Sequence, residues 1–302
     1  MNDATADITV IIPFYNRETY IHEAVQSVLD QTLKPKQIII VNDCSRESSR
    51  RCLDRYADRC TILDLPKNVG LAGARNAAIQ IAEGKFIALL DDDDIWLPHK
   101  LEVQYRYIQE HPDCSGVHSA VWLILFARPD LRYKKFDSQP LPLSQALTHL
   151  QWVIPSTLLI RTDVVRAVAG FDPWFRENED RDFVVRCCAA GYRFEGIDEP
   201  LVRFRRTGHQ HLAGQHMKMY RSHMKLCWKH RALYYQVFGL KGLFMFLLES
   251  AYLVIGGYIG DRELETRRKA KILPGVMWRL HQWLRVNYQV RRDYQERVSC
   301  GV

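Results

Sequence analysis

The sequence feature that most constrains this chain is a run of four aspartates, Asp91–Asp94, which directly follows the apolar stretch Phe86–Leu90. Residues 95–98 then turn the chain away. Four carboxylates at the end of a buried strand raise one another's pKa, so a cation has to neutralise them. A hard divalent ion such as Mg2+ or Mn2+ prefers oxygen ligands and keeps coordination positions open for phosphate groups. The run therefore predicts a metal and diphosphate site at the edge of a sheet.

Three other interpretations of this acidic run compete with the metal site. A solvated acidic turn seldom follows five apolar residues so directly. A calcium loop of the helix–loop–helix type needs glycine at the sixth position from Asp91, where Trp96 stands. An aspartyl phosphatase also uses a strand-end Asp-x-Asp, so that alternative stays open.

Strands and helices alternate along the first hundred residues. Short apolar runs predict buried strands, and segments with apolar residues on one face predict helices. The predicted strands are 8–14, 37–41, 61–65 and 85–90, and the predicted helices are 18–31, 46–58 and 73–83. Right-handed crossovers between such strands give an α/β fold with a mostly parallel sheet and helices on both faces. Tyr15, Asp43 and the acidic run then meet at one edge, as in nucleotide sites.

Missing motifs exclude several classes of protein. No Gly-x-Gly-x-x-Gly follows the first predicted strand and no Gly-x-x-x-x-Gly-Lys-Ser/Thr loop occurs, which argues against dinucleotide dehydrogenases and P-loop enzymes. The eight cysteines form no Cys-x-x-Cys pair, so we expect the reduced thiols of an intracellular protein. The N-terminus has no basic segment followed by an apolar one, so no signal peptide is expected.

Four motifs occur in the order in which family 2 glycosyltransferases carry them. They are Val10–Asn16, Ile40–Ser45, Asn68-x-Gly70 with Ala74–Asn76, and Leu90–Asp94. Over residues 8–206 the chain resembles this family of inverting enzymes, which have the GT-A fold and use nucleotide-activated sugars. The resemblance implies a catalytic domain over 1–210, with a nucleotide-binding half (1–98) and an acceptor-binding half (99–210). The Gln-x-x-Arg-Trp motif of the processive synthases is absent, so transfer of a single sugar is expected.

The resemblance assigns the donor's nucleoside to residues near the ends of the first strands. Pro13 and Tyr15 would flank the base, and Asp43 would bind the nucleoside. Arg75 would approach the base or the diphosphate. Each has a structural alternative: Tyr15 caps the sheet edge, Asp43 forms an Asx turn, and Arg75 pairs with an aspartate.

The resemblance also assigns the acidic run. Asp91 and Asp93 match the Asp-x-Asp pair, with Asp93 as the more direct ligand of a Mn2+ or Mg2+ ion, and Asp92 faces the ribose. The chemistry agrees, because a departing nucleoside diphosphate gains negative charge that a divalent ion stabilises without proton transfer. The expected cofactor is a divalent metal. The expected donor is a nucleoside-diphosphate sugar, and the habit of the family favours uridine.

A second acidic cluster opens the predicted helix 181–190. Glu179 and Asp180 match the Glu-Asp position of the family, where the aspartate is the general base that takes the proton from the acceptor hydroxyl. Asp180 is therefore the expected catalytic residue, and Glu179 would orient the acceptor or the base. Simple capping by acids at a helix N-terminus is the alternative. We expect Asp182 to cap the helix or to form a salt bridge.

Basic residues lie within and just after the predicted strand 201–205. They are Arg203, Arg205, Arg206, His209 and His211. In the family this segment is a flexible lid near the diphosphate, which implies that His209 binds the metal or the diphosphate. A solvated run of charge is the alternative.

Positive charge is concentrated at the end of the chain. Residues 203–302 contain 19 Lys and Arg against 6 Asp and Glu, which indicates an anionic partner, either nucleic acid or a phospholipid surface. Gly242–Gly260 is apolar, but Glu249 at its middle favours an interfacial helix over a spanning one. Tryptophans among the following basic residues suit an anionic membrane. We therefore expect a helical C-terminal region, 211–302, that is peripheral on the cytoplasmic membrane face through 215–302 and binds no nucleic acid. An ordinary helical appendage or a dimer contact is the alternative.

These features predict a metal-dependent inverting glycosyltransferase. It would move one sugar to a glycan or lipid-linked acceptor in polysaccharide or glycoconjugate synthesis. A nucleotidyltransferase or phosphohydrolase with the same acidic metal site is the first alternative, and it needs no Asp180 opposite the diphosphate. A non-catalytic nucleotide-sugar binding module is the second, and it would bind the donor without turnover.

Overall fold

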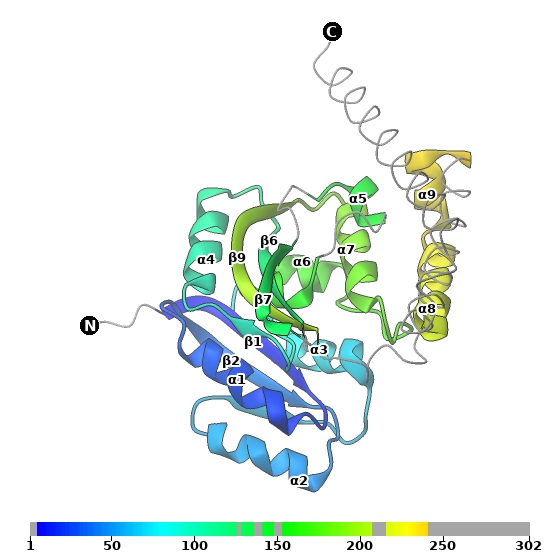
Figure 1. Ribbon diagram of the computed structural model, residues 1–302. Coiled ribbons are helices and arrows are strands. Elements are labelled where there is room, and N and C mark those ends of the chain that lie inside the picture. Colours follow the sequence, from blue (N-terminus) through cyan, green and yellow to red (C-terminus); the bar gives the residue numbers. More distant parts are fainter. Residues whose placement is uncertain (1–4, 126–127, 136–140, 148–152, 207–215, 241–302) are drawn as a thin grey trace. The chain divides into compact units, whose positions relative to one another are not determined.

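The computed structural model describes residues 5–125, 128–135, 141–147, 153–206 and 216–240 (Figure 1). The chain divides into two compact units, residues 1–243 and 244–302. All described residues belong to the first unit. The predicted interfacial helix Gly242–Gly260 and the basic residues after it lie outside the described residues, and so does His209.

The first unit is built on one mixed sheet of nine described strands. The strands are β1 (Thr5–Phe14), β2 (Lys34–Asn42), β3 (Thr61–Asp64), β4 (Phe86–Leu89), β5 (Ile95–Trp96), β6 (Gly116–Leu125), β7 (Arg128–Lys135), β8 (Leu159–Arg161) and β9 (Phe194–Arg206). Their order is β3-β2-β1-β4-β8-β6-β9-β5, and β7 pairs with β6 off this path. The pairs among β1 to β4 are all parallel, as predicted. β8 is antiparallel to both β4 and β6, so the second half of the sheet is mixed.

Helices cover both faces of the parallel half, which confirms the predicted fold class. The helices are α1 (Glu18–Leu29), α2 (Glu47–Arg50), α3 (Gly70–Ile81), α4 (Lys100–Glu110), α5 (Leu143–Leu147), α6 (Thr162–Ala167), α7 (Glu179–Ala189), α8 (His216–Lys229) and α9 (Arg231–Phe238). Alternate residues of β1 point to opposite faces. Val10 and Ile12 share a core with Ile21 and Val25 of α1. Ile11 is buried on the other face, where α3 packs against β1 and β2.

The carboxyl ends of β1, β2 and β4 meet at one edge of the sheet. Phe14 of β1 pairs with Asn42 of β2, and Ile11 of β1 pairs with Leu89 of β4. The chain therefore leaves these strands at Tyr15, Asp43 and the acidic run, all at the same edge. This juxtaposition follows from parallel pairing and agrees with the expectation from the sequence.

Strand β9 brings a distant segment to the acidic run. It runs parallel to β6, and its Val202 and Arg203 also pair with Trp96 and Ile95 of β5. Because β5 directly follows the acidic run, the carboxyl end of β9 lies beside that run.

Two predicted helices differ from those observed. The helix expected over 46–58 is split into α2 and a 3-10 helix, Arg51–Tyr56. The helix expected from residue 73 begins earlier, at Gly70, whose φ is +75°. That start depends on Asp43, whose carboxylate accepts hydrogen bonds from the first amides of α3. A partner so far away in the sequence is invisible to a local pattern.

The described part of the C-terminal region, α8 and α9, is attached to α7 and to the residues just before it. The Ser222 hydroxyl donates to the carbonyl of Glu177, next to the start of α7. The imidazole of His230 is hydrogen-bonded to Asp182 of α7 over 2.8 Å. Within the described ranges, no helix combines the length and the apolar character needed to cross a membrane.

Candidate functional site

The acidic run forms a tight turn at the end of β4. The amide of Asp94 donates to the carbonyl of Asp91 over 3.1 Å. The side chains of Asp91 and Asp93 are 24% and 17% exposed, whereas Asp92 and Asp94 are buried. The turn therefore leaves accessible the two alternate carboxylates of the predicted Asp-x-Asp pair.

Arg17, three residues after the end of β1, is the first cation at this turn. Its Nη1 donates to Oδ1 of Asp92 at 3.0 Å and to Oδ2 of Asp93 at 2.8 Å. Burial raises the pKa of Asp92 to about 7; Arg17 opposes this shift and the charge of Asp93 adds to it. No motif in the sequence singled out Arg17. Its position just beyond a strand that neighbours β4 was the signal that could have identified it.

Arg75 of α3 is the second cation, and its side chain is 1% exposed. Its Nη2 donates to Oδ1 of Asp91 at 2.7 Å, and its Nη1 donates to Oε1 of Glu179 at 2.8 Å. Its guanidinium carbon lies 5.2 Å from the ring centroid of Phe171. Burial lowers the pKa of Arg75, but the charges of Asp91 and Glu179 outweigh this effect and raise it. One buried side chain thus joins the two acidic clusters. Pairing of Arg75 with an aspartate was the structural alternative in the sequence analysis, and the structure shows that pairing with Asp91.

Glu179 and Asp180 begin α7, after Asn178 in a left-handed conformation with φ of 64°. Asparagine tolerates that conformation better than most residues. Glu179 is buried, and burial raises its pKa to about 7, with the charge of Asp180 adding to the shift. Asp180 is half-buried, and its Oδ1 accepts from the amide of Arg181 at 2.7 Å. Burial also raises the pKa of Asp180. Carboxylates with increased proton affinity suit acid–base chemistry.

Asp182 contrasts with these two neighbours, because it forms ion pairs with Lys229 and Arg186 and is hydrogen-bonded to His230. It accepts from His230 at 2.8 Å, from Lys229 at 2.7 Å and from Arg186 at 2.7 Å. Burial alone would raise its pKa, but these partners lower the pKa to about 2. The expected salt-bridging role of Asp182 is confirmed, and it ties α7 to the end of α8.

At the carboxyl end of β2, Asp43 is buried and bound to the start of α3. Its Oδ1 accepts from the amide of Val69 at 2.7 Å, and its Oδ2 accepts from the amide of Gly70 at 2.9 Å. The Asx-type hydrogen bond belongs instead to Asn42, whose Oδ1 accepts from the amide of Ser45 at 3.0 Å. Asp43 therefore holds α3, the helix that carries Arg75, against the end of β2.

Pro13 and Tyr15 differ in exposure. Pro13 is buried in β1 opposite Val41, whereas Tyr15 is 48% exposed just after the strand. The next residue, Asn16, donates its amide to the Ser45 hydroxyl at 3.1 Å and so ties the ends of β1 and β2 together. Tyr15 thus presents an accessible aromatic ring at the edge where the acidic turn also lies.

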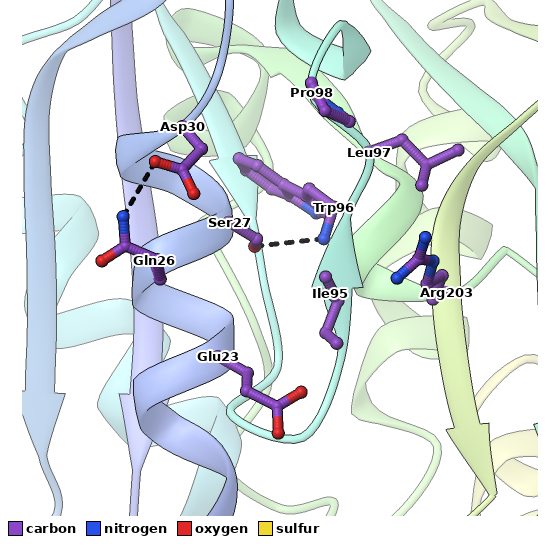
Figure 2. A pocket seen from close by; sticks show the side chains of 9 residues that line it. All are labelled: Glu23, Gln26, Ser27, Asp30, Ile95, Trp96, Leu97, Pro98 and Arg203. Carbon is purple, nitrogen blue, oxygen red and sulfur yellow. Dashed lines mark hydrogen bonds between the residues drawn. The ribbon is translucent and has the colours of Figure 1, made fainter.

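A groove of about 320 Å³ lies between α1 and the segment after the acidic turn (Figure 2). It is lined by Glu23, Gln26, Ser27, Asp30, Ile95, Trp96, Leu97, Pro98 and Arg203. The amide of Trp96 donates to the Ser27 hydroxyl at 3.1 Å, which anchors this segment to α1. None of the predicted site residues lines the groove, so it is distinct from the site at the sheet edge.

The structure brings together nine of the ten predicted site residues at one sheet edge and at the facing start of α7. The tenth, His209, lies in 207–215, outside the described residues, and its role stays a prediction. Among the residues that the structure describes, no three His, Cys, Asp or Glu side chains are arranged to hold one ion.

Comparison with known families identifies this arrangement. The family model described as glycosyl transferase family 2 matches residues 9–167, just over half of the chain. The chain belongs to glycosyl transferase family 2. It is therefore an inverting glycosyltransferase, as the order of its motifs predicts, and the matched region contains the acidic turn together with Asp43 and Arg75.

The names of two curated relatives of this family 2 transferase state a biosynthesis or a reaction. The putative teichuronic acid biosynthesis glycosyltransferase TuaG of Bacillus subtilis (strain 168) is 32% identical over 204 residues, which cover 66% of this chain and 78% of TuaG. The UDP-Glc:alpha-D-GlcNAc-diphosphoundecaprenol beta-1,3-glucosyltransferase WfgD of Escherichia coli is 40% identical over 98 residues, which cover 32% of this chain and 39% of WfgD.

A solved structure shares the fold of this family 2 transferase. The mannosyltransferase PcManGT from Pyrobaculum calidifontis, in complex with GDP-Man and Mn2+, superposes with a TM-score of 0.62 at 14% identity. The match covers 91% of this chain and 80% of PcManGT. This likeness supports the predicted GT-A architecture.

Proposed function

We propose that this family 2 enzyme moves one sugar from a nucleoside-diphosphate sugar, with UDP as the nucleotide, to a glycan or lipid-linked acceptor in polysaccharide or glycoconjugate synthesis. The observation that carries the proposal is the bridge made by Arg75. It binds Asp91 of the acidic turn through one nitrogen and Glu179 of the second cluster through the other. The names of TuaG and WfgD support the product class, and the name of WfgD supports a UDP-sugar and a lipid-linked acceptor.

The acidic turn fits a bound Mn2+ or Mg2+ ion. The carboxylates of Asp91, Asp92 and Asp93 pair with only two guanidinium groups, those of Arg17 and Arg75, and Arg75 is shared with Glu179, so negative charge remains in excess. Such ions take only one or two protein carboxylates when substrate phosphates complete the coordination. Asp93 and Asp91, the two accessible members, would hold the ion. When bound, the ion would neutralise the charge that develops on the departing diphosphate.

Asp180 is the proposed general base. In the displacement, its carboxylate takes the proton from an acceptor hydroxyl while that oxygen forms a bond to the anomeric carbon. The bond from that carbon to the diphosphate breaks, and the electron pair leaves with the diphosphate oxygen. Attack from the opposite face gives a β-linked product from an α-linked donor. Glu179, held by Arg75, would orient the base or the acceptor.

The nucleoside is assigned to the ends of β1 and β2. Tyr15 offers an exposed ring for stacking, and Pro13 supports it from within the strand. Asp43 and Asp92 would contact the nucleoside and the ribose. The buried position of Arg75 favours support of the diphosphate end through Asp91 over direct stacking on a base.

The test is donor turnover across a panel of UDP-, GDP- and TDP-sugars, with Mn2+, with Mg2+ and with EDTA. Wild type, Asp180→Asn and the exposed control Asp113→Asn would be compared. We expect one donor to be turned over only with metal, at wild-type rate by the control and 10²- to 10⁴-fold more slowly by Asp180→Asn, the contribution typical of a general base.

Product analysis separates the alternatives. A β-linked product with free nucleoside diphosphate supports inversion, and retention of configuration would contradict the mechanism. Release of a nucleotide-sugar or of phosphate, unaffected by Asp180→Asn, would favour the nucleotidyltransferase or phosphohydrolase. Tight binding of a donor without turnover by any acceptor would favour a binding module.

We further propose that the C-terminal region places the enzyme on an anionic membrane at the cytoplasmic face. Residues 216–240 contain no Asp or Glu. Trp228 is 67% exposed, with the guanidinium carbon of Arg231 at 4.6 Å from its ring centroid. Trp174 is also exposed, with Nζ of Lys225 at 5.1 Å from its ring centroid. Aromatic rings among cations favour the headgroup region of an anionic bilayer.

Vesicle sedimentation tests this placement. We expect binding to phosphatidylglycerol vesicles that salt weakens, and little binding to phosphatidylcholine. Trp228→Ala should weaken the binding, whereas Ile81→Ala, which removes an exposed apolar side chain from α3, should not. Equal binding to both lipids, or none, would contradict the membrane proposal without touching the transferase proposal.

A further inference from the structure

The fourth aspartate of the acidic turn does not share the environment of the other three. Asp94 is 1% exposed, whereas Asp91 and Asp93 are accessible. Among the described residues its carboxylate forms no ion pair. Oδ2 accepts from the Ser156 hydroxyl at 2.5 Å, and Oδ1 accepts from the amide of Arg205 at 3.1 Å. A buried carboxylate with two neutral donors is bound inward, away from a ligand.

Ser156 holds both ends of the turn through one oxygen. Its hydroxyl donates to Asp94 and accepts from the amide of Asp91 at 3.1 Å. The side chain is completely buried, in the 3-10 helix Pro155–Thr157 that precedes β8. The spacing between the first and last residues of the turn, and so the placement of Asp93 between them, depends on this hydroxyl.

The same 3-10 helix is fastened to the segment after the turn. The indole Nε1 of Trp96 donates to the carbonyl of Ser156 at 2.8 Å, and Nε2 of Gln104 donates to the carbonyl of Thr157 at 2.7 Å. Nζ of Lys100 donates to Gln104 at 2.6 Å and lies 3.9 Å from the ring centroid of Trp96. Ser156 therefore stands on a rigid support, which a positioning residue requires.

The other oxygen of Asp94 reaches the end of β9. Arg205 is the penultimate residue of that strand, and its guanidinium group pairs with Glu23 of α1. Asp94 thus connects three segments that are far apart in the sequence: the acidic turn, the 3-10 helix before β8 and the carboxyl end of β9.

We propose that Asp94 and Ser156 are a pair of positioning residues that set the geometry of Asp91 and Asp93 and couple the acidic turn to the end of β9. Neither touches the donor. The functional consequence rests on the proposed function, because the geometry they set is that of the metal and diphosphate ligands. Replacement of residues that orient metal ligands commonly costs 10- to 100-fold in metal affinity or activity.

The first measurement is hydrogen exchange of the free protein, followed by mass spectrometry. The variants are Ser156→Ala, Asp94→Asn and, as a matched control, Ser115→Ala, a buried serine near the opposite ends of β4 and β8. We expect faster exchange in peptides covering 90–97 and 203–206 for the first two variants and not for the control. If hydrogen exchange becomes faster only around residue 156, the acidic turn is not coupled to the end of β9 through Asp94 and Ser156.

The second measurement is UDP binding by calorimetry, with Mn2+ and with EDTA. Mn2+ should strengthen binding to wild type and to Ser115→Ala, and this gain should fall about 10- to 100-fold in Ser156→Ala. The double variant Ser156→Ala/Asp94→Asn should lose no more than the larger single loss, because the two residues act as a unit. If the losses of the Mn2+ effect in the two single variants add up in the double variant, the two residues do not act as a unit. If Mn2+ strengthens UDP binding to Ser156→Ala as much as to wild type, Ser156 does not position the metal ligands. Either result would contradict the proposal.

The two measurements separate the two proposals. If wild type binds no UDP, the proposed donor is wrong, while the exchange data still decide whether Asp94 and Ser156 couple the turn to β9. Thermal unfolding of each variant shows that it is folded. Ser156→Thr, which keeps the hydroxyl, should restore the exchange pattern and the Mn2+ effect toward wild type, a rescue that a purely space-filling role would not give.

Discussion

The acidic turn and the start of α7 are both rich in carboxylates, but they are compensated differently. In the turn, Arg17 and Arg75 pair with three of the four aspartates, and Asp94 is bound by neutral donors. At α7, Lys229, Arg186 and His230 all contact Asp182 and lower its pKa to about 2, and Lys229 also pairs with Asp172. Glu179 shares Arg75 with the turn, and burial raises its pKa to about 7.

The number of cations around each carboxylate distinguishes an acid that fastens the fold from acids that still lack positive charge. Asp182 has all the cations it needs within the fold and serves to fasten α7. The turn and the Glu179–Asp180 pair remain short of positive charge, as expected where a ligand or a proton completes the site. Position in the sequence does not reveal this, since Asp180 and Asp182 are two residues apart on one helix.

Removal of the shared cation should have the largest effect. Arg75→Met leaves Asp91 and Glu179 buried or partly buried without their partner, and breaking such a pair costs about 3–5 kcal/mol of unfolding free energy. Urea unfolding should show this loss, together with loss of sugar transfer. The exposed pair of Arg193 with Glu195 provides the control, because Arg193→Met should cost under about 1 kcal/mol. Similar losses of unfolding free energy in both variants would show that Arg75 contributes no more to stability than an exposed ion pair does.

Removal of an accessible aspartate should affect metal binding more than stability. Asp93→Asn is expected to weaken the Mn2+ dependence of UDP binding about 10- to 100-fold, with little change in the melting temperature, since one carboxylate fewer relieves repulsion in the turn. Calorimetry with and without EDTA measures the first effect and thermal unfolding the second. A variant with unchanged metal dependence would show that Asp93 is not a ligand.

Removal of the compensated aspartate should affect stability and leave the chemistry almost unchanged. The pKa of Asp182 is lowered from 3.8 to about 2, which corresponds to about 2 kcal/mol of stability. Because the folded-state pKa is depressed, this contribution is complete above about pH 4 and is lost as the pH falls toward 2. Urea unfolding from pH 7 to pH 3 should show Asp182→Asn less stable at pH 7 and the two proteins converging in acid. If the difference in unfolding free energy between wild type and Asp182→Asn is the same at every pH, the lowered pKa of Asp182 is not the source of its contribution to stability.

The smallest effect is expected at Asp43. Its carboxylate binds the first amides of α3, so Asp43→Ala should cost about 1 kcal/mol of unfolding free energy, the usual value of a helix cap. If Asp43 also contacts the nucleoside, UDP affinity should fall further than the loss of stability explains. Melting temperature and UDP affinity measured on the same variant separate the two roles.

Much of the fold and of the site was predictable because it depends on local patterns and on parallel pairing. Apolar runs defined β1, β2 and β4, and their shared direction placed Tyr15, Asp43 and Asp91 at one edge. The roles of Arg17 and Ser156 were harder to predict, because parallel pairing brings Arg17 to this edge without singling it out and does not place Ser156 there at all. Each reaches the turn across 60 residues or more, and an arginine in a turn or a serine before a strand has no local pattern that marks it.

The sequence alone therefore determined the family, the α/β architecture and the identity of the two acidic clusters, since motif order and periodicity are properties of the chain. The tertiary structure alone decided which acids are paired, which are accessible and which cation joins the clusters. The physical reason is that the pKa of a carboxylate depends on its burial and on charges within a few ångströms, and those neighbours come from β1, α3, β9 and α8 rather than from adjacent residues.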